Sequence, residues 1–370
     1  MAFANTIDPA HAAPRLHAWL AGRLDDATDV QVGTITIPTS SGMSTETVMF
    51  EATWSAGGER RAQRCVARVQ PRGDALFPSY DLTREAAIMR ALAAHTDVPV
   101  PAVLFEEPGD EVFDAPFFVM ERIDGEVPGD DPPFTTGGWV MGLDAAARTA
   151  LCANGLEVLA KIHGADLAKL PVADGTAQDG AAALDAQLRI WERFAGWATD
   201  GATHPTIGPA LEWLRRERPA SPGEAVLSWG DARLGNMLFG PDQQVNAVLD
   251  WEMAGIAPRG FDLAWWMFIT RHHTEGIGVP LPSGFPTAEQ TVERYTELTG
   301  HQPRDLHYYE AFAATRLSIL VVRAAGLMIG AGLLPADSQM AFVNPATNLL
   351  ADLLGLPAPE GEAAYYIGNR

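Results

Sequence analysis

The sequence predicts an α+β protein with a small β-rich N-terminal lobe and a larger, mostly helical C-terminal lobe. At 370 residues, the chain exceeds the usual size of a single hydrophobic core. Strand-like segments gather before about residue 121, and helical spacing of apolar residues dominates from about residue 140 onward. We therefore expect a first lobe over 1–121, a connector over 122–126 and a second lobe over 127–370.

The elements of the first lobe follow from periodicity and turn residues. A helix is expected over 15–24, where Leu16, Trp19, Leu20 and Leu24 share one face. Strand-like segments follow at 32–38, 47–54 and 64–70; the loop TSSGMST (39–45) separates the first two, and Gly57-Gly58 turns the chain into the third. The stretch 81–92 predicts a helix with Asp81 as its N-cap. FFVMERIDGE (117–126) reads as a buried strand that enters the connector.

One carboxylate lies on the apolar stripe of the helix at 81–92. Glu85 is flanked on that stripe by Leu82 and Met89, and an inward-facing carboxylate is costly unless it is paired. Arg68 is equally out of place in the middle of the strand CVARV. An Arg68–Glu85 ion pair would explain both residues, and the alternative is that Glu85 lies at the edge of the stripe and reaches water.

Composition narrows the class of partner. Hydrophobic residues make up 47% and charged residues 20% of the chain, which is typical of a globular protein. The net charge of −21 argues against nucleic acid or an anionic membrane as partner; it serves solubility or favours a cationic or neutral substrate.

The cysteines and the apolar segments bear on the compartment. The two cysteines, Cys65 and Cys152, lack metal-ligand spacing and do not suggest a disulfide framework. The first residues show no secretory signal pattern, and we expect a cytoplasmic protein. The most apolar window, 317–334, carries Arg323 and three glycines, so we expect a packed core helix there.

A predicted hairpin in the second lobe carries polar residues at its open end. MLF (237–239) and VNAVL (245–249) flank the turn GPDQQ. If Phe239 pairs with Val245, then Asn236 pairs with Val248 and Asp250 lies one step beyond. Alternation would place Asn236 and Asp250 on one face with Cβ atoms roughly 7–8 Å apart, a gap that one oxygen-ligated cation can bridge.

Two further polar residues precede this hairpin. Asp231 follows the apolar run AVLSW in a turn that contains Gly230, and Arg233 comes two residues later. Two carboxylates, an amide oxygen and a guanidinium are suited to binding Mg²⁺ and phosphate groups. Any one of them alone fits a turn or a helix cap, so their joint spacing is the informative feature.

This spacing resembles the kinase order of catalytic Asp, basic residue at +2, Asn at +5 and a metal-binding Asp about fourteen residues later. The segments WGDARLGNMLF, AVLDWE and FDLAWW make the chain similar to the aminoglycoside phosphotransferase/choline kinase-like family. Within it, the chain resembles the branch of kinase-like domains attached to some acyl-CoA dehydrogenases. The resemblance extends over about residues 15–350 and implies a bilobal protein-kinase-like fold.

The resemblance also implies a role for each matching residue. Asp231 would be the catalytic base for the acceptor hydroxyl, and Arg233 would neutralise charge on the γ-phosphoryl group in transfer. Asn236 and Asp250 would hold Mg²⁺, and Asp262 would brace the catalytic loop from a buried position. Arg68, paired with Glu85, would contact the phosphates of ATP in the N-terminal nucleotide-binding lobe. The loop with Ser41, Gly42 and Ser44 would cover these phosphates, and the backbone near Met120 and Arg122 would face the adenine.

The implied function is an ATP- and Mg²⁺-dependent phosphotransferase that acts on a hydroxyl of a small molecule. The sequence departs from the family at Trp229, where the family usually has the His of His-Gly-Asp. This departure keeps a second interpretation open: a nucleotide-binding pseudokinase with a sensing or scaffolding role.

Three histidines receive structural interpretations. His163 falls at helical spacing with Leu156 and Leu159, which predicts packing at a helix end. His272 and His273 are adjacent, and this spacing does not suit a chelating helix face.

Overall fold

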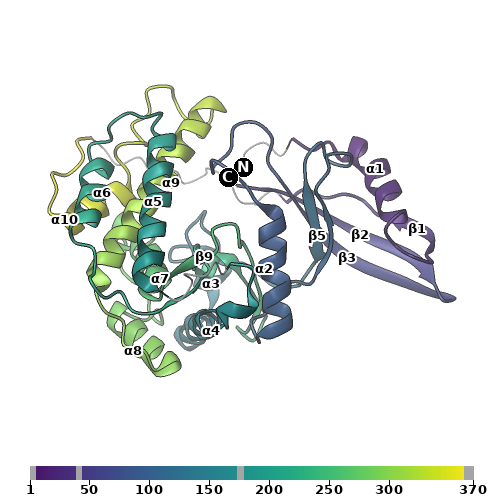
Figure 1. Ribbon diagram of the computed structural model, residues 1–370, viewed down its shortest axis with the longest axis horizontal. Coiled ribbons are helices and arrows are strands. Elements are labelled where there is room, and N and C mark those ends of the chain that lie inside the picture. The colour runs from purple at the N-terminus through teal and green to yellow at the C-terminus, as the bar shows by residue number, and fades with distance from the viewer. Residues whose placement is uncertain (1–5, 39–43, 173–178, 362–370) are drawn as a thin grey trace. The chain divides into compact units, whose positions relative to one another are not determined.

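The computed structural model describes residues 6–38, 44–172 and 179–361, and it confirms the predicted α+β class (Figure 1). The chain forms two compact units, one comprising Met1–Arg90 and Pro101–Ile123, the other Ala91–Val100 and Asp124–Arg370. Residues 91–100, which the sequence placed in the first lobe, therefore group by their contacts with the second unit.

The first unit is built on an antiparallel five-stranded sheet with the order β1-β2-β3-β5-β4 (Figure 1). The strands are β1 (Thr28–Val32), β2 (Glu46–Ala56), β3 (Glu59–Val69), β4 (Val103–Glu107) and β5 (Phe117–Glu121). Gly57 and Gly58 form the tight β2–β3 turn in left-handed conformations, as predicted. The predicted strand at 32–38 is wrong in extent. Only Val32 of this segment belongs to β1. Beyond it, the Gly33 N–H donates to the Glu51 carbonyl, and an isolated bridge between Thr36 and Met49 keeps the chain beside β2.

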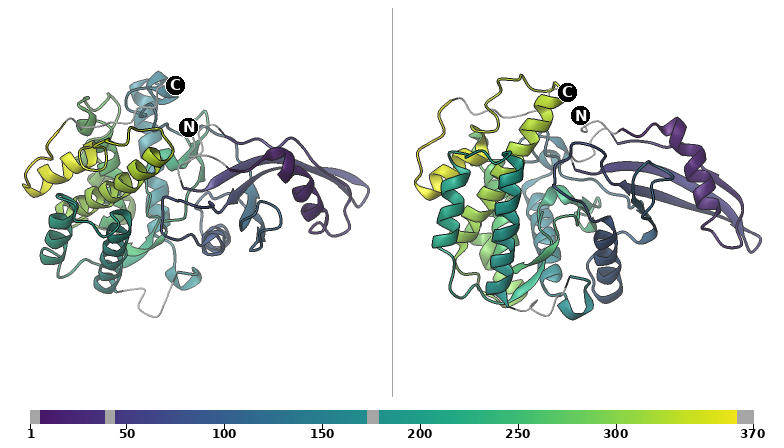
Figure 2. Two further views of the ribbon diagram at one scale, coloured as in Figure 1. Left: turned by 90° about the horizontal axis from the view of Figure 1, so that it is seen from above. Right: turned by 45° about the horizontal axis from the view of Figure 1, so that its top comes forward.

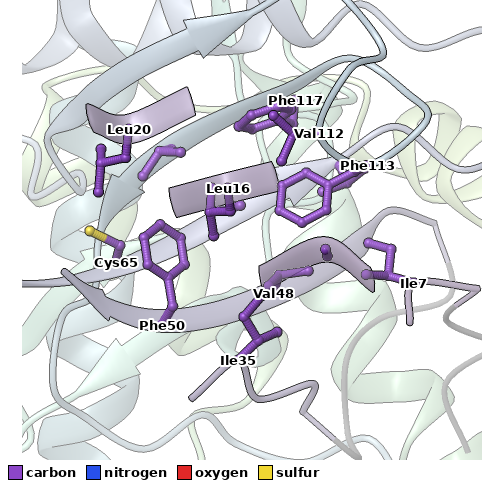
Figure 3. Packing of buried hydrophobic residues seen from close by; sticks show 14 of the residues in the cluster. Ile7, Leu16, Leu20, Ile35, Val48, Phe50, Cys65, Val112, Phe113 and Phe117 are labelled. Atoms are coloured by element: carbon purple, nitrogen blue, oxygen red, sulfur yellow. The ribbon is translucent and has the colours of Figure 1, made fainter. Parts of the chain in front are cut away.

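Helix α1 (Pro9–Ala21) covers one face of this sheet. It begins earlier than predicted because the Asp8 carboxylate accepts the N–H of Ala10 as an N-cap, and it ends before Leu24. Its residues Leu16 and Leu20 pack onto Phe50 and the other apolar side chains of the sheet (Figure 3). Burial of this stripe, rather than helix propensity, stabilises α1 against the strands.

Helix α2 (Leu82–His95) begins as predicted, with the Asp81 carboxylate accepting the N–H of Arg84 at 2.9 Å. Glu85 is only 3% exposed, which rules out the alternative that it reaches water at the edge of the stripe.

The second unit is mostly helical, with two small two-stranded sheets. Its helices are α3 (Gly138–Gly142), α4 (Ala145–His163), α5 (Gly180–Ala198), α6 (Ile207–Arg216), α7 (Gly260–His272), α8 (Ala288–Thr299), α9 (Leu306–Gly330) and α10 (Pro345–Leu354), with short 3₁₀ turns η1 (Leu167–Lys169), η2 (Leu234–Asn236) and η3 (Glu275–Ile277). Strand β6 (Ala225–Ser228) pairs with β9 (Gly255–Pro258), and β7 (Met237–Phe239) pairs with β8 (Val245–Val248).

Helix α9 is the central packing element of the second unit. It contacts α5, α6, α7 and α10, and both views of Figure 2 show it among these helices. By length and composition it is the one described helix that could cross a membrane, but 67% of its most apolar window is buried inside the protein. It contains residues 317–330 of the apolar segment predicted at 317–334, and it packs in the core of this unit.

The two cysteines lie in different units and are free. Cys65 is in β3 and Cys152 is in α4. Burial raises the pKa of each thiol to about 12, so both remain protonated at neutral pH.

The start of α6 depends on a neutral histidine. His204 is 4% exposed, and its Nε2 donates to the Ala341 carbonyl at 2.9 Å. Its Nδ1 accepts the N–H groups of Thr206 and Ile207, both at 3.2 Å. Burial lowers the pKa of His204, and the hydrogen bond to the Ala341 carbonyl partly offsets this effect. A proton on Nδ1 would also face two backbone donors.

This depressed pKa predicts a loss of stability in mild acid. The contribution of neutral His204 is fully present above the unfolded pKa of about 6.5 and is lost as pH falls through the lower folded pKa. The slope from this one group is ~1.4 kcal/mol per pH unit within that window. When the pH is lowered from 7.5 to 5.5, the free energy of unfolding measured in urea should fall less for His204→Gln than for the wild type. An equal loss in both proteins would contradict this assignment.

Candidate active site

The loop after β6 is anchored by a backbone bend at Gly230. Its φ of 87° is left-handed, and a Cβ there would lie 2.2 Å from the Met253 carbonyl oxygen. Only glycine fits this position, as the sequence predicted for the turn before Asp231.

Asp262 of α7 holds the same loop from below. It is fully buried, and its carboxylate accepts the Ser228 hydroxyl at 2.7 Å and the N–H groups of Trp229 and Gly230 at 2.7 and 3.1 Å. His163 Nε2 lies 3.2 Å from the same carboxylate. Burial alone would raise the pKa of Asp262, but the hydrogen bond and charge of His163, aided by Ser228, outweigh it and lower the pKa. The predicted brace is therefore an ionised carboxylate that ties α7 to the loop.

Asp231 carries a carboxylate oriented by three donors. Oδ1 accepts the indole N–H of Trp265 at 2.8 Å. Oδ2 accepts from Arg233 Nε at 3.0 Å and from Asn236 Nδ2 at 2.7 Å. The side chain is 17% exposed, so the group is held in one orientation and still meets solvent. This arrangement suits a group that accepts a proton from a positioned hydroxyl.

Arg233 lies between two carboxylates. Besides its bond to Asp231, its Nη1 donates to the carboxylate of Asp130, a residue that the sequence analysis did not single out. Burial would lower the pKa of Arg233, but the charges of Asp130 and Asp231 raise it overall. Likewise, desolvation would raise the pKa of Asp130, and the charge of Arg233 lowers it. The guanidinium is therefore permanently charged and spans both acids.

The hairpin register differs from the prediction by one residue at its open end. Phe239 pairs with Val245 as expected, but Val248 pairs with Met237 rather than with Asn236. A bulge between Leu238 and Phe239 shifts the ladder, because two residues on one strand then oppose one on the other. Strict alternation therefore cannot be used to place Asn236 and Asp250.

Backbone contacts nevertheless bring these two residues to one place. The Leu249 N–H donates to the Asn236 carbonyl at 2.9 Å, and Asp250 follows directly with a left-handed φ of 62°. The amide of Asn236 turns its N–H₂ toward the carboxylate and carbonyl of Asp231, at 2.7 and 3.1 Å. Its remaining acceptor is the amide oxygen, the atom type that Mg²⁺ prefers. An amide oxygen and a carboxylate are ligand types that suit a hard cation which also keeps phosphate and water ligands.

Trp229 occupies the position at which the resemblance of the sequence implies a His. It is fully buried, and its indole N–H points at the carbonyls of Leu249 and Asp250, at 3.0 and 3.1 Å. The indole N–H thus links the loop of Asp231 to the backbone of Asp250. The side chains of both Trp and His carry an N–H group that can donate such a bond.

Trp229→Phe should separate this tie from simple volume filling. We expect a loss of about 1–2 kcal/mol in unfolding free energy, because two buried carbonyls lose their donor. We also expect a lower kcat, since a displacement of ~1 Å at a reacting group is costly. Urea unfolding measures the first effect, and turnover kinetics measure the second.

Trp251→Phe is the matched control, because Trp251 is 1% exposed and donates its indole N–H to the Val248 carbonyl at 3.2 Å. It should cost similar stability with a smaller change in kcat. Equal losses of kcat in both variants would mean that the Trp229 N–H matters no more for turnover than the Trp251 N–H.

The predicted residues of the first unit form one close pair. Arg68 Nη2 lies 3.4 Å from Glu85 Oε1, and both side chains are largely buried, so the predicted ion pair is present. Met120 pairs with Val66 and Val103 inside the sheet. The Arg122 N–H donates to the Arg64 carbonyl at 2.9 Å, so this donor serves the sheet.

The expected phosphate-covering loop is only partly described. Ser44 lies two residues before β2 and is half-buried, whereas Ser41 and Gly42 lie outside the described residues.

Three contributors to the site escaped sequence reasoning. His163 is a helix-end packing residue as predicted, but its ring also bridges the Tyr295 hydroxyl at 2.5 Å and Asp262. Trp265 and Asp130 contact Asp231 and Arg233 from distant parts of the chain, and no local pattern marks them. Within 6–38, 44–172 and 179–361, no group of three or more His, Cys, Asp or Glu residues forms a candidate metal site.

Comparisons with known proteins bear on the family and the fold of the chain. The sequence model described as the phosphotransferase enzyme family matches residues 39–298. Acyl-CoA dehydrogenase family member 11 of Mus musculus is 28% identical over 257 residues, which cover 66% of this chain and 31% of that protein. The chain thus spans about a third of the length of the curated relatives it matches.

Solved structures share the fold. A protein of Ralstonia eutropha JMP134, provisionally named an aminoglycoside phosphotransferase, matches with a TM-score of 0.65 and 22% identity over 92% of this chain and 95% of that one. An aminoglycoside phosphotransferase in ternary complex with ADP and hygromycin B matches with a TM-score of 0.53 and 17% identity over 94% and 99% of the two chains. The predicted kinase-like fold is therefore confirmed.

Proposed function

The chain belongs to the phosphotransferase enzyme family, and we propose that it transfers the γ-phosphoryl group of ATP to a hydroxyl of a small molecule in a Mg²⁺-dependent reaction. The observation that carries this proposal is the orientation of Asp231 by Trp265, Arg233 and Asn236 on a loop anchored by Asp262. Phosphoryl transfer asks little covalent chemistry of a protein, and positioning of this kind is its main requirement.

Each residue then has a distinct task. Asp231 accepts the proton of the acceptor hydroxyl while that oxygen bonds to the γ-phosphorus and the bond to the β–γ bridging oxygen breaks. Arg233, charged and held by two carboxylates, orients Asp231 and faces the negative charge of the moving group. Asn236 and Asp250 would hold Mg²⁺, which supplies charge neutralisation of the phosphates when bound.

The first unit supplies the nucleotide contacts in this proposal. The buried ion pair with Glu85 holds the Arg68 guanidinium in one place, which suits a contact to the α- and β-phosphates. Ser41, Gly42 and Ser44 would cover the phosphates, and the backbone around Met120 and Arg122 would meet the adenine. The strongly acidic chain favours a neutral or cationic acceptor over an anionic one.

Nucleotide binding and transfer are tested separately. ATP with Mg²⁺ should stabilise the protein by about 2.7 kcal/mol when the free nucleotide concentration is a hundred times Kd. A thermal-shift titration detects this stabilisation. Single-turnover transfer is then measured on a panel of alcohols, amino-alcohols and hydroxyacyl thioesters. Absence of any shift at millimolar nucleotide would refute the proposal as a whole.

Asp250→Asn should reduce the Mg²⁺-dependent part of the shift. Asp242→Asn is its control, because Asp242 lies exposed in the turn of the same hairpin, where its carboxylate accepts the N–H of Gln244. Equal shifts in the two variants would remove Asp250 from the metal site.

The second candidate is a nucleotide-binding pseudokinase, which Trp229 in place of the family's His favours. A full Mg²⁺·ATP shift without transfer to any member of the panel is the outcome that selects it. The hydrogen bond from the Trp229 indole N–H to the Asp250 carbonyl supports the active enzyme instead. Through this bond, Trp229 still connects the loop of Asp231 to the backbone of Asp250.

A further inference from the structure

Arg316, in the middle of α9, is a buried guanidinium enclosed by aromatic rings. The residue is 1% exposed, and its Cζ lies 4.2 Å from the ring centroids of Phe261 and Trp265. The ring of Trp191 is 4.9 Å away on another side. Rings compensate part of the cost of burying a cation, but apolar side chains would fill the same space without that cost. The charge at this position therefore calls for a role.

The polar contact of Arg316 is to the loop of the active site. Its Nη2 donates to the carbonyl of Gly230, the residue directly before Asp231. That carbonyl belongs to the one residue of the loop whose left-handed backbone excludes every other amino acid. A charged donor fixes a carbonyl more strongly than a neutral one, so Arg316 restrains the peptide that leads into Asp231.

A second route runs through Trp265. The Arg316 guanidinium packs against the indole ring of Trp265. The N–H of the same indole donates to Asp231 Oδ1 at 2.8 Å. The cation thus holds both the backbone before Asp231 and one donor to its carboxylate. Burial lowers the pKa of Arg316 to about 10, partly opposed by Asp262 and Asp231, so the group stays charged at neutral pH.

We propose that Arg316 is a positioning residue: through the Gly230 carbonyl and the Trp265 ring, it fixes the carboxylate of Asp231 in the orientation that transfer requires. The kinetic consequence rests on the proposed function, whereas the restraint on the loop does not. Arg316 does not touch the nucleotide or the acceptor in this scheme.

The main test compares two arginines of the same helix. Arg316→Met removes the charge and keeps an apolar side chain of similar length, and Arg323→Met does the same at a second arginine, whose guanidinium stacks on Trp197 at 4.4 Å. For Arg316→Met we expect kcat to fall about 10- to 100-fold, the loss typical of a hydrogen bond to a charged group, with the KM for ATP changed less than about twofold. Arg323→Met should stay within about twofold in both constants. A rise in the KM for ATP as large as the fall in kcat would overturn the proposal. An equal loss of kcat in both variants would also overturn it.

A second readout works even without a known acceptor. Amide hydrogen exchange over residues 229–236 should be at least about tenfold faster in Arg316→Met than in wild type or Arg323→Met, while exchange in α4 and α8 stays unchanged. Wild-type exchange over 229–236 in a folded Arg316→Met protein would overturn the proposal. If the wild type transfers phosphate to no acceptor, the proposed function fails, and the exchange result still decides whether Arg316 restrains the loop.

Arg316→Lys covers the case in which the methionine variant does not fold. The ammonium keeps the charge among the rings but loses the planar fork, so we expect a folded protein with intermediate kcat and intermediate exchange over 229–236. A lysine variant with reduced stability but wild-type kcat and wild-type loop exchange would mean that Arg316 only supports the core, contrary to the proposal.

Discussion

Asp231→Ala should lower kcat by about 10³-fold, within the range for loss of a general base, and leave the nucleotide-dependent thermal shift in place. The reason is that the carboxylate, held by Trp265, Arg233 and Asn236, has one task in transfer and no contact in the nucleotide part of the scheme. Steady-state kinetics with the best acceptor of the panel measures kcat, and the ATP titration checks binding. Residual turnover above about a tenth of wild type would refute the assignment of the base.

Asp130→Asn is the comparison that separates two causes of this loss. Both variants take one carboxylate away from Arg233, but only Asp231→Ala removes the group proposed to face the acceptor hydroxyl. The side chain of Asp130 is about half exposed (46%), so water can replace its contact to Arg233. We expect less than about a tenfold loss of kcat for Asp130→Asn. Equal losses in the two variants would indicate that Arg233, rather than Asp231, controls the rate.

Asp262→Asn should reduce the free energy of unfolding by about 3–5 kcal/mol, the range for breaking a buried charged network. The carboxylate serves donors on both of its oxygens, and an amide must turn its own N–H₂ toward at least one of them. Because the folded pKa of Asp262 is lowered, its contribution is present above the unfolded pKa of about 3.9 and is lost as pH falls below it. Urea unfolding at pH 7 and pH 3.5 measures both effects.

Glu275→Gln provides the surface control. Glu275 pairs with Arg271 at 2.7 Å, but its side chain is 56% exposed. Loss of such a pair costs less than about 1 kcal/mol. If Asp262→Asn costs no more than this control, then the buried carboxylate does not anchor the loop.

Much of the fold could be predicted because its elements repeat simple patterns. The stripe of α1, the double-glycine turn after β2 and the Asp81 cap of α2 are local features, and each is present. The Arg68–Glu85 pair could be predicted across the chain, because two misplaced charges in one lobe have few ways to be compensated.

The hairpin register and the supporting residues could not be predicted. A β-bulge adds one residue without any mark in the sequence around Leu238 and Phe239, and it shifts Asn236 out of the expected pair. Asp130, Trp265 and Arg316 reach the loop from far along the chain, so only the tertiary structure reveals them. Local chemistry thus marked the candidate reacting groups, and tertiary packing determines what holds them.

The bend at Gly230 has a consequence for any library of variants of this protein. With a carbonyl oxygen 2.2 Å from where a side chain would begin, codon 230 should tolerate no change, whichever acceptor is used for selection. Libraries aimed at new acceptors should therefore leave that codon untouched.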